Sequence, residues 1–206
     1  MIVFLARHGQ SLWNRRKLVT GQHDPALAPE GEAQAQDLAV LLRDVALSAV
    51  YASDLSRSRE TARVVADEQG REVRQLPALR ELHFGTMQGR FRDERDPEVA
   101  TLWRARKADP LRFCAPGGES FADLITRVRF PVRQILKAHP TGTVLIVGHR
   151  NTNRAILATL LGWAPEQAVT AVVRHDCLYR LRMGTPPGVS PIRFSSPRTV
   201  EPAVPS

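Results

Sequence analysis

Short apolar runs along the chain predict the strands of a buried sheet. Residues 2–5 form a run rich in β-branched and aromatic side chains, and residues 143–148 read as a fully buried central strand. Further strands are expected at 48–52, 72–76, 169–174 and 177–183, with an edge strand at 192–194. These runs are short and bounded by Gly, Pro or polar residues, as strands of a compact domain are.

Apolar side chains at three- and four-residue spacing predict helices between these strands. One helix opens at Pro29, and a second is expected to be N-capped by Ser53 and Asp54 and to end at Gly70. The strongest pattern runs over 121–136, where Pro131 should kink the helix or divide it. Further helices are expected at 12–17, 96–107 and 151–161. The order predicts an α/β fold, a three-layer α/β/α sandwich around a mostly parallel sheet.

The length of 206 residues fits one domain over 1–206. The turn-rich segment 90–118 is expected to be an insertion that covers the site, and 197–206 to be a loose tail. No apolar run approaches a membrane span, and residues 2–6 are too short for the core of a signal peptide. We therefore expect a cytoplasmic protein, with no membrane partner and with Cys114 and Cys177 as free thiols. The sequence indicates nothing about the oligomeric state.

Basic residues dominate the charge, which is +8 at pH 7. Lysine occurs only at positions 17, 107 and 137, so the remaining 26 of the 29 basic residues are arginines. They are scattered, with no basic helix and no zinc-finger spacing, and nucleic-acid binding is not expected. An attraction for small anionic molecules is the better interpretation.

Candidate chemistry gathers where strands end or helices begin. Arg7, His8 and Gly9 follow the first strand, His149 follows the central strand, and Arg57 and Glu81 lie near the ends of two others. Each residue alone has an ordinary structural interpretation. Ligands of open parallel sheets bind at the carboxyl ends of the strands, so together these side chains predict a phosphate site with an acid beside it.

These motifs resemble the signature of the histidine phosphatase superfamily, the phosphoglycerate mutase-like group. The resemblance spans roughly residues 1–183. It is carried by Arg7-His8-Gly9-Gln10-Ser11 with Asn14, by 21–24, 31–35 and 53–62, by 79–85 with 88–89, and by 116–120 and 147–149. The resemblance implies a phosphoglycerate mutase-like fold.

The resemblance also implies residue roles. His8 would attack the phosphorus and carry a phosphohistidine, and Glu81 would protonate the leaving group and then activate water. The charge on the phosphoryl oxygens would be held by Arg7, Arg57 and His149. Contacts to phosphate or substrate are expected from Gln10, Ser11, Asn14, Thr20 and Gly21. No metal and no cofactor are expected, and the histidines at 23, 83, 139 and 175 are interpreted as structural or peripheral.

Arg150 departs from the family pattern, which usually has a small residue after the second histidine. Its side chain either turns to solvent or adds a cation for a second anionic group on the substrate. The segment between Gly89 and Pro116 is shorter than in the cofactor-dependent mutases. We therefore favour a phosphomonoester hydrolase acting on a small phosphorylated metabolite. A cofactor-dependent phosphoglycerate mutase is the alternative, and a non-catalytic phosphate-binding protein is a further one.

Overall fold

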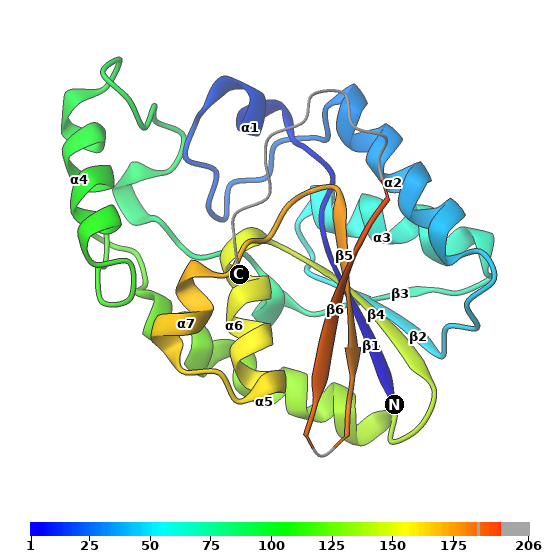
Figure 1. The fold of residues 1–206 in the computed structure, drawn as a ribbon. Coiled ribbons are helices and arrows are strands. Elements are labelled where there is room, and N and C mark those ends of the chain that lie inside the picture. The colour runs from blue at the N-terminus through cyan, green and yellow to red at the C-terminus, as the bar shows by residue number, and fades with distance from the viewer. Residues whose placement is uncertain (185, 195–206) are drawn as a thin grey trace.

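The computed structural model describes residues 1–184 and 186–194, in which a six-stranded sheet lies between helices (Figure 1). The predicted α/β architecture is therefore confirmed. The predicted tail at 197–206 lies outside the described residues. The strands are β1 (Ile2–Arg7), β2 (Ala49–Ala52), β3 (Val73–Gln75), β4 (Thr143–Gly148), β5 (Cys177–Arg182) and β6 (Gly188–Arg193).

The sheet has the strand order β3-β2-β4-β1-β5-β6. β3, β2, β4 and β1 are parallel to one another, whereas β5 and β6 run antiparallel at one edge. β1 and β4 lie side by side at the centre, with Arg7 opposite Gly148 at their carboxyl ends. The residues that follow these two strands therefore emerge next to each other.

Seven helices occur within the described residues. They are α1 (Leu12–Arg16), α2 (Pro29–Leu42), α3 (Ser56–Glu68), α4 (Pro97–Ala108), α5 (Phe121–Ala138), α6 (Arg150–Leu161) and α7 (Pro165–Thr170). α4 lies far from the sheet, at the left of Figure 1. Two short 3-10 turns, Pro77–Leu79 and Gly85–Met87, lie between β3 and α4.

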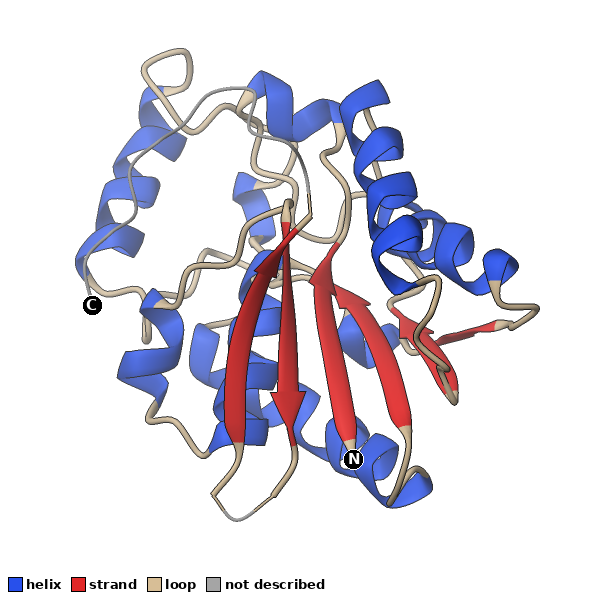
Figure 2. Ribbon diagram, turned by 45° about the vertical axis from the view of Figure 1, so that its right-hand side comes forward, coloured by secondary structure: helices blue, strands red, loops and turns tan. Residues whose placement is uncertain are grey.

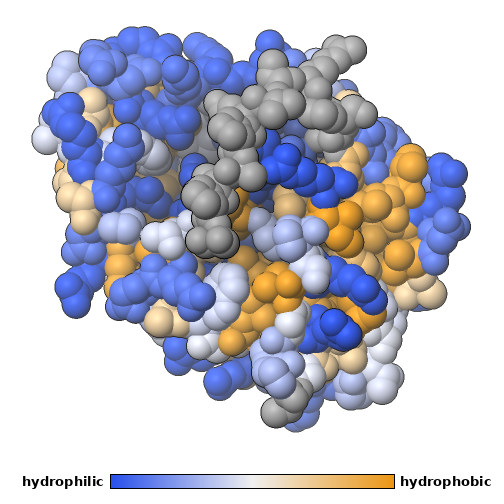
Figure 3. Space-filling view, in the orientation of Figure 1, coloured by the Kyte–Doolittle hydropathy of each residue, from blue (hydrophilic) through white to orange (hydrophobic). Residues whose placement is uncertain are grey.

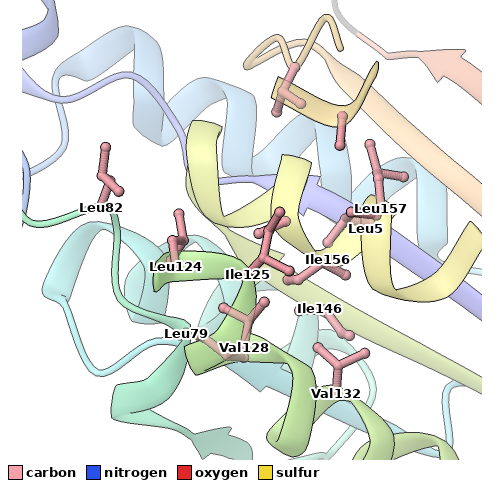
Figure 4. Close-up of a cluster of buried hydrophobic side chains, with 14 of the residues drawn as sticks. Leu5, Leu79, Leu82, Leu124, Ile125, Val128, Val132, Ile146, Ile156 and Leu157 are labelled. Carbon is pink, nitrogen blue, oxygen red and sulfur yellow. The ribbon is translucent and has the colours of Figure 1, made fainter. Parts of the chain in front are cut away.

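The two faces of the sheet carry separate hydrophobic cores, and Figure 2 shows helices on both sides of the strands. On one face α2 and α3 pack over Phe4, Val50 and Leu145. On the other, α5 and α6 pack over Leu5 and Ile146, as the close-up in Figure 4 shows. Alternate residues of the buried strands thus face opposite cores, and both layers hold the strand ends in place.

The predicted strand at 169–174 is wrong. Pro165 opens α7, and Ala168 and Val169 are buried on that helix. The residues after α7 give their carbonyl groups to side chains rather than to a sheet: Ala171 accepts from Arg154 and Val173 from Arg7. A short apolar run fits a helix or a strand equally, and here the proline and these side-chain contacts decide.

The predicted start of α3 is also corrected. Leu55, not Ser53 or Asp54, is the N-cap, and the exposed N–H of Ser56 donates to the carboxylate of Asp24 at 2.8 Å. Asp54 instead pairs with Arg80. Capping from a distant loop leaves no local sequence signal.

The division of the helix at Pro131 is likewise wrong, because α5 continues through Pro131. The helix buries Phe121, Leu124, Val128 and Val132 completely. This continuous apolar face holds α5 against the sheet and α6 despite the proline.

The surface around α1 and α4 is mostly hydrophilic in Figure 3, whereas hydrophobic residues gather toward the lower centre and right. Within the described part of the chain, no helix has the length and apolar character needed to cross a membrane.

Candidate active site

Two histidines meet at the carboxyl ends of β1 and β4. The amide of His8 donates to the carbonyl of Gly148 at 2.9 Å, which extends the β1–β4 pairing by one residue. The ring centres of His8 and His149 are 5.0 Å apart. Both side chains are almost completely buried, with exposed fractions of 4% and 0%. The structure therefore brings together the two histidines that the sequence places 141 positions apart.

The hydrogen bonds of His8 assign its tautomer. Its Nδ1 lies 2.6 Å from the carbonyl oxygen of Gly9, which can only accept, so Nδ1 carries the proton. Nε2 then holds the free lone pair. Burial lowers the pKa of His8 well below its usual value, and the nearby Arg57, His149, His175 and Arg7 lower it further. A neutral imidazole with an unpaired Nε2 has the state that a nucleophile requires.

Arg57 and Arg7 place guanidinium groups beside this pair. Arg57 is 1% exposed and donates to the carbonyls of His23, at 2.6 Å, and Gly21, at 2.7 Å. Arg7 donates to Val173 at 3.2 Å. Burial lowers the pKa of Arg7 to about 9 and that of Arg57 to about 10, so both remain charged at neutral pH. The Nε atoms of both arginines are buried and have no partner among the described residues.

His149 and Thr20 have further unpaired polar atoms. Nε2 of His149 lies 2.7 Å from the hydroxyl of Ser53, while its Nδ1 is buried without a described partner. The hydroxyl oxygen of Thr20 is buried in the same way. When Nε2 of His149 accepts from the Ser53 hydroxyl, Nδ1 carries the proton and is a free donor. Buried polar groups are nearly always hydrogen-bonded in native proteins, so these unpaired groups favour an anionic ligand with several acceptor oxygens.

Glu81 is fixed at the N-terminus of α6. Its carboxylate accepts from the amides of Leu82 at 2.8 Å, Asn151 at 3.2 Å and Thr152 at 3.3 Å. Helix N-termini attract anions, so the carboxylate is both oriented and stabilised there. It is 8% exposed and lines the same cavity as His8. Glu81 can therefore serve as an acid or a base toward a ligand bound at His8.

The remaining predicted substrate contacts divide into two groups. Asn14, Thr20, Gly21 and Arg150 line the cavity, whereas Gln10 and Ser11 do not. Ser11 caps α1 by accepting from the amide of Asn14. The backbone amide of Gln10 donates to the side chain of Gln34, at 2.9 Å. These contacts give Gln10 and Ser11 a role in local structure, and their contact with substrate stays a prediction.

The cavity has a volume of about 520 Å³ and is strongly basic. Its charged lining residues are Arg7, Lys17, Arg57, Arg92, Arg106, Lys107, Arg150 and Arg154, with only Glu81 and Asp93 as acids. Phe84 and Trp103 add aromatic surface. Such a lining favours a small molecule with more than one negative charge.

Sequence reasoning missed several residues that support the site. His175 was interpreted as structural or peripheral, but its Nδ1 lies 2.7 Å from the carbonyl oxygen of His8. Arg127 of α5 donates to the carbonyl of Glu81 at 3.2 Å and pairs with Glu119. The contacts to His8 and Glu81 join segments far apart in the chain, so no local motif indicated them. Glu119 lies in the motif 116–120, and it is the one residue of this group that a sequence motif included.

Buried histidines should make the protein less stable in acid. The unfolded chain protonates His8 and His149 near pH 6.5, while the folded protein resists protonation because both pKa values are lowered. The unfolded state thus binds more protons below pH 6.5, and the free energy of unfolding falls as the pH drops. We expect about 1 kcal/mol of loss for each group between pH 6.5 and 5.5.

Urea unfolding at pH 7.5, 6.5 and 5.5 measures this loss. Carboxylates with lowered pKa, such as Asp54, have an ordinary value of 3.8 and lose their contribution only at lower pH. The chosen window therefore reports mainly on histidines. A free energy of unfolding that is constant or rises toward pH 5.5 would contradict the prediction.

The fold and this arrangement of side chains define a member of the histidine phosphatase superfamily, branch 1, whose family model matches residues 3–186; the chain belongs to this family. Among curated relatives, the probable phosphoglycerate mutase GpmB of Erwinia tasmaniensis is 36% identical over 176 residues, which cover 85% of this chain and 81% of that protein. The corresponding protein of Yersinia enterocolitica is 33% identical over 180 residues, covering 87% and 83%.

Similar solved structures carry phosphatase names. The α-ribazole phosphatase of Shigella flexneri has a TM-score of 0.85 and 27% identity, covering 98% of this chain and 100% of that chain. A mycobacterial glucosyl-3-phosphoglycerate phosphatase, solved as a complex with VO3, has a TM-score of 0.81 and 26% identity, covering 88% and 90%. The comparisons confirm the phosphoglycerate mutase-like fold predicted from the sequence.

Proposed function

We propose that the protein is a phosphomonoester hydrolase that acts on a small phosphorylated metabolite through a phosphohistidine on His8. One observation carries the proposal. The free Nε2 of a neutral His8 shares a basic cavity with Glu81 and with buried arginine nitrogens that have no described protein partner. A phosphoryl group offers the electrophile and the acceptor oxygens that these groups lack.

In the first half-reaction, Nε2 of His8 attacks the phosphorus. A bond forms between Nε2 and phosphorus while the bond from phosphorus to the ester oxygen breaks. Glu81 in its protonated form gives its proton to that oxygen, so the alcohol leaves neutral. Arg7, Arg57 and the Nδ1 atom of His149 hold the three other phosphoryl oxygens, whose negative charge persists through the transfer.

In the second half-reaction, water replaces the alcohol. Glu81, now a carboxylate, accepts a proton from the water as its oxygen bonds to phosphorus and the bond to Nε2 breaks. The fixed hydrogen bonds from α6 and Leu82 hold the carboxylate in one place for both steps. Inorganic phosphate leaves, and His8 and Glu81 return to their starting states.

Hydrolysis is favoured over mutase activity because the segment between Gly89 and Pro116 is short and contributes only one helix, α4. A mutase must keep water from the phosphohistidine, and a longer covering segment would serve that purpose. The phosphatase names of the similar structures support the same choice. Phosphoglycerate mutase remains the second candidate, because the curated relatives bear that name.

A phosphate-release assay over a panel of phosphomonoesters tests the proposal. We expect release from at least one small metabolite and the same rate after EDTA treatment, because arginine and histidine supply the positive charge. Conversion of 3-phosphoglycerate to 2-phosphoglycerate in the presence of 2,3-bisphosphoglycerate, faster than phosphate release, would favour the mutase instead. Loss of activity in EDTA, restored by a metal, would contradict the metal-independent mechanism.

The cytoplasmic location expected from the sequence is part of the same proposal, since small phosphorylated metabolites are held there. Cell fractionation with an antibody against the protein tests it. Recovery in a membrane or secreted fraction would contradict it.

A further inference from the structure

Three further arginines line the same cavity as Arg7 and Arg57. Arg92 precedes α4, Arg106 lies in the last turn of α4, and Arg150 is the first residue of α6. None of them forms an ion pair with a carboxylate of residues 1–184 or 186–194. The ion pairs nearby involve other partners: Asp93 pairs with Arg95, and Asp96 and Glu98 pair with Arg90.

Aromatic rings and an amide hold two of these arginines in place. The guanidinium carbon of Arg106 lies 5.2 Å from the ring centre of Phe84 and 5.2 Å from that of Trp103. Its Nη2 donates to the side-chain oxygen of Asn151 at 3.0 Å. Arg92 lies 5.4 Å from the Trp103 ring. These contacts orient the guanidinium groups without neutralising them.

The three charges repel one another. Burial lowers the pKa of Arg92 and of Arg106, and the positive charge of Arg150 lowers both further. Asp93 partly offsets this effect at Arg92, and Glu81 does so at Arg106. Asp93 is already paired with Arg95, however, and the carboxylate oxygens of Glu81 already accept from α6 and from Leu82. Gathering like charges at a cavity wall is unfavourable unless an anion binds between them.

The position of Glu81 relates this cluster to the reaction. The side-chain oxygen of Asn151 accepts a hydrogen bond from Arg106, and the backbone N–H of Asn151 donates one to the Glu81 carboxylate. In the proposed mechanism Glu81 faces the ester oxygen that leaves. The cluster therefore lies on the side of the leaving alcohol, and Arg7 and Arg57 remain for the phosphoryl group.

We propose that Arg92, Arg106 and Arg150 form a subsite for a second anionic group, a carboxylate or a phosphate, on the alcohol part of the substrate. This inference rests on the proposed function and narrows its substrate class to phosphomonoesters with two anionic groups. Phe84 and Trp103 supply apolar surface for the carbon chain between them. The sequence suggested one cation, Arg150, for a second anionic group. The proposed subsite adds Arg92 and Arg106 from two other segments of the chain.

Matched substrates test the subsite. In the first pair, 3-phosphoglycerate carries a carboxylate where glycerol 3-phosphate carries a neutral hydroxymethyl group. In the second pair, 1,3-propanediol bisphosphate carries a second phosphate that 1,3-propanediol monophosphate lacks. We expect kcat/KM to favour the member with two anionic groups in at least one pair. The pair that shows the preference identifies the anion. Charge-assisted hydrogen bonds of this kind correspond to about 10- to 100-fold in affinity.

Variants assign the preference to these arginines. Arg150→Gln and Arg106→Gln should each lower the kcat/KM ratio within the preferred pair by about 10-fold, mainly through KM. Arg104→Gln is the matched control, because Arg104 also lies on α4 but is exposed and absent from the cavity lining. It should keep the wild-type ratio. Thermal unfolding of each variant checks that the fold is retained.

A binding measurement separates failure of the subsite from failure of the proposed function. Calorimetric titration of the His8→Ala variant with each matched pair reads the preference without turnover. Selective binding by the variant, together with no phosphate release by the wild type from any substrate, would support the subsite and overturn the hydrolase. Phosphate release with equal kcat/KM and equal binding within both pairs would overturn the subsite and leave the hydrolase standing.

Discussion

His8→Ala should lower kcat for phosphate release by about 10⁴-fold or more, the largest single effect expected in this chain. The reason is that Nε2 of His8 is the only protein atom in the proposed mechanism that bonds to phosphorus, so its loss removes both half-reactions. When the variant reacts with a substrate that carries a radiolabelled phosphoryl group and is then denatured, it should also retain no label on the protein. In the wild type, such label should be labile to acid and stable to base, as a phosphoramidate is.

His139→Gln is the matched control for this substitution. His139 ends α5, its Nε2 lies 2.9 Å from the hydroxyl of Tyr51, and it is not among the residues that line the cavity. It should keep wild-type kcat and labelling. Activity or acid-labile label that survives in His8→Ala would exclude His8 as the nucleophile, whatever the substrate.

Glu81→Gln should lower kcat by about 10²- to 10⁴-fold with an alkyl phosphate, because the alkoxide then leaves without a proton. With p-nitrophenyl phosphate the first step should be nearly normal, since nitrophenolate needs no proton to leave. The second step still lacks its base. Rapid mixing should therefore show a burst of about one nitrophenolate per active site followed by slow turnover.

Glu166→Gln, an exposed position in the first turn of α7, is the control and should behave as the wild type. Equal losses of kcat for the alkyl and nitrophenyl substrates, with no burst, would show that Glu81 does not act as the proton donor. The carboxylate would then serve to orient α6 and its neighbours, which its three amide contacts would also explain.

Much of the fold could be predicted because its signals are local. The residues of β1 and β4 are apolar almost without interruption, whereas a half-exposed strand alternates apolar and polar residues. In residues 121–136 the apolar side chains recur at the three- and four-residue spacing of a helix. The predictions were wrong where tertiary contacts determined the local structure. The carbonyls of Ala171 and Val173 bind arginines instead of a strand, and Asp24 caps α3 from 32 positions away.

The sequence by itself determined the residue types of the site and the strand ends that carry them, because a motif such as Arg7-His8-Gly9 is contiguous in the chain. Only the tertiary structure decided what these residues contact. The β1–β4 register sets His8 beside His149, and the Gly9 carbonyl leaves Nε2 of His8 free. A hydrogen bond from Arg106 of α4 to Asn151 of α6 brings these two residues together beside Arg150. Such contacts depend on how helices and strands pack, and no spacing along one chain records that.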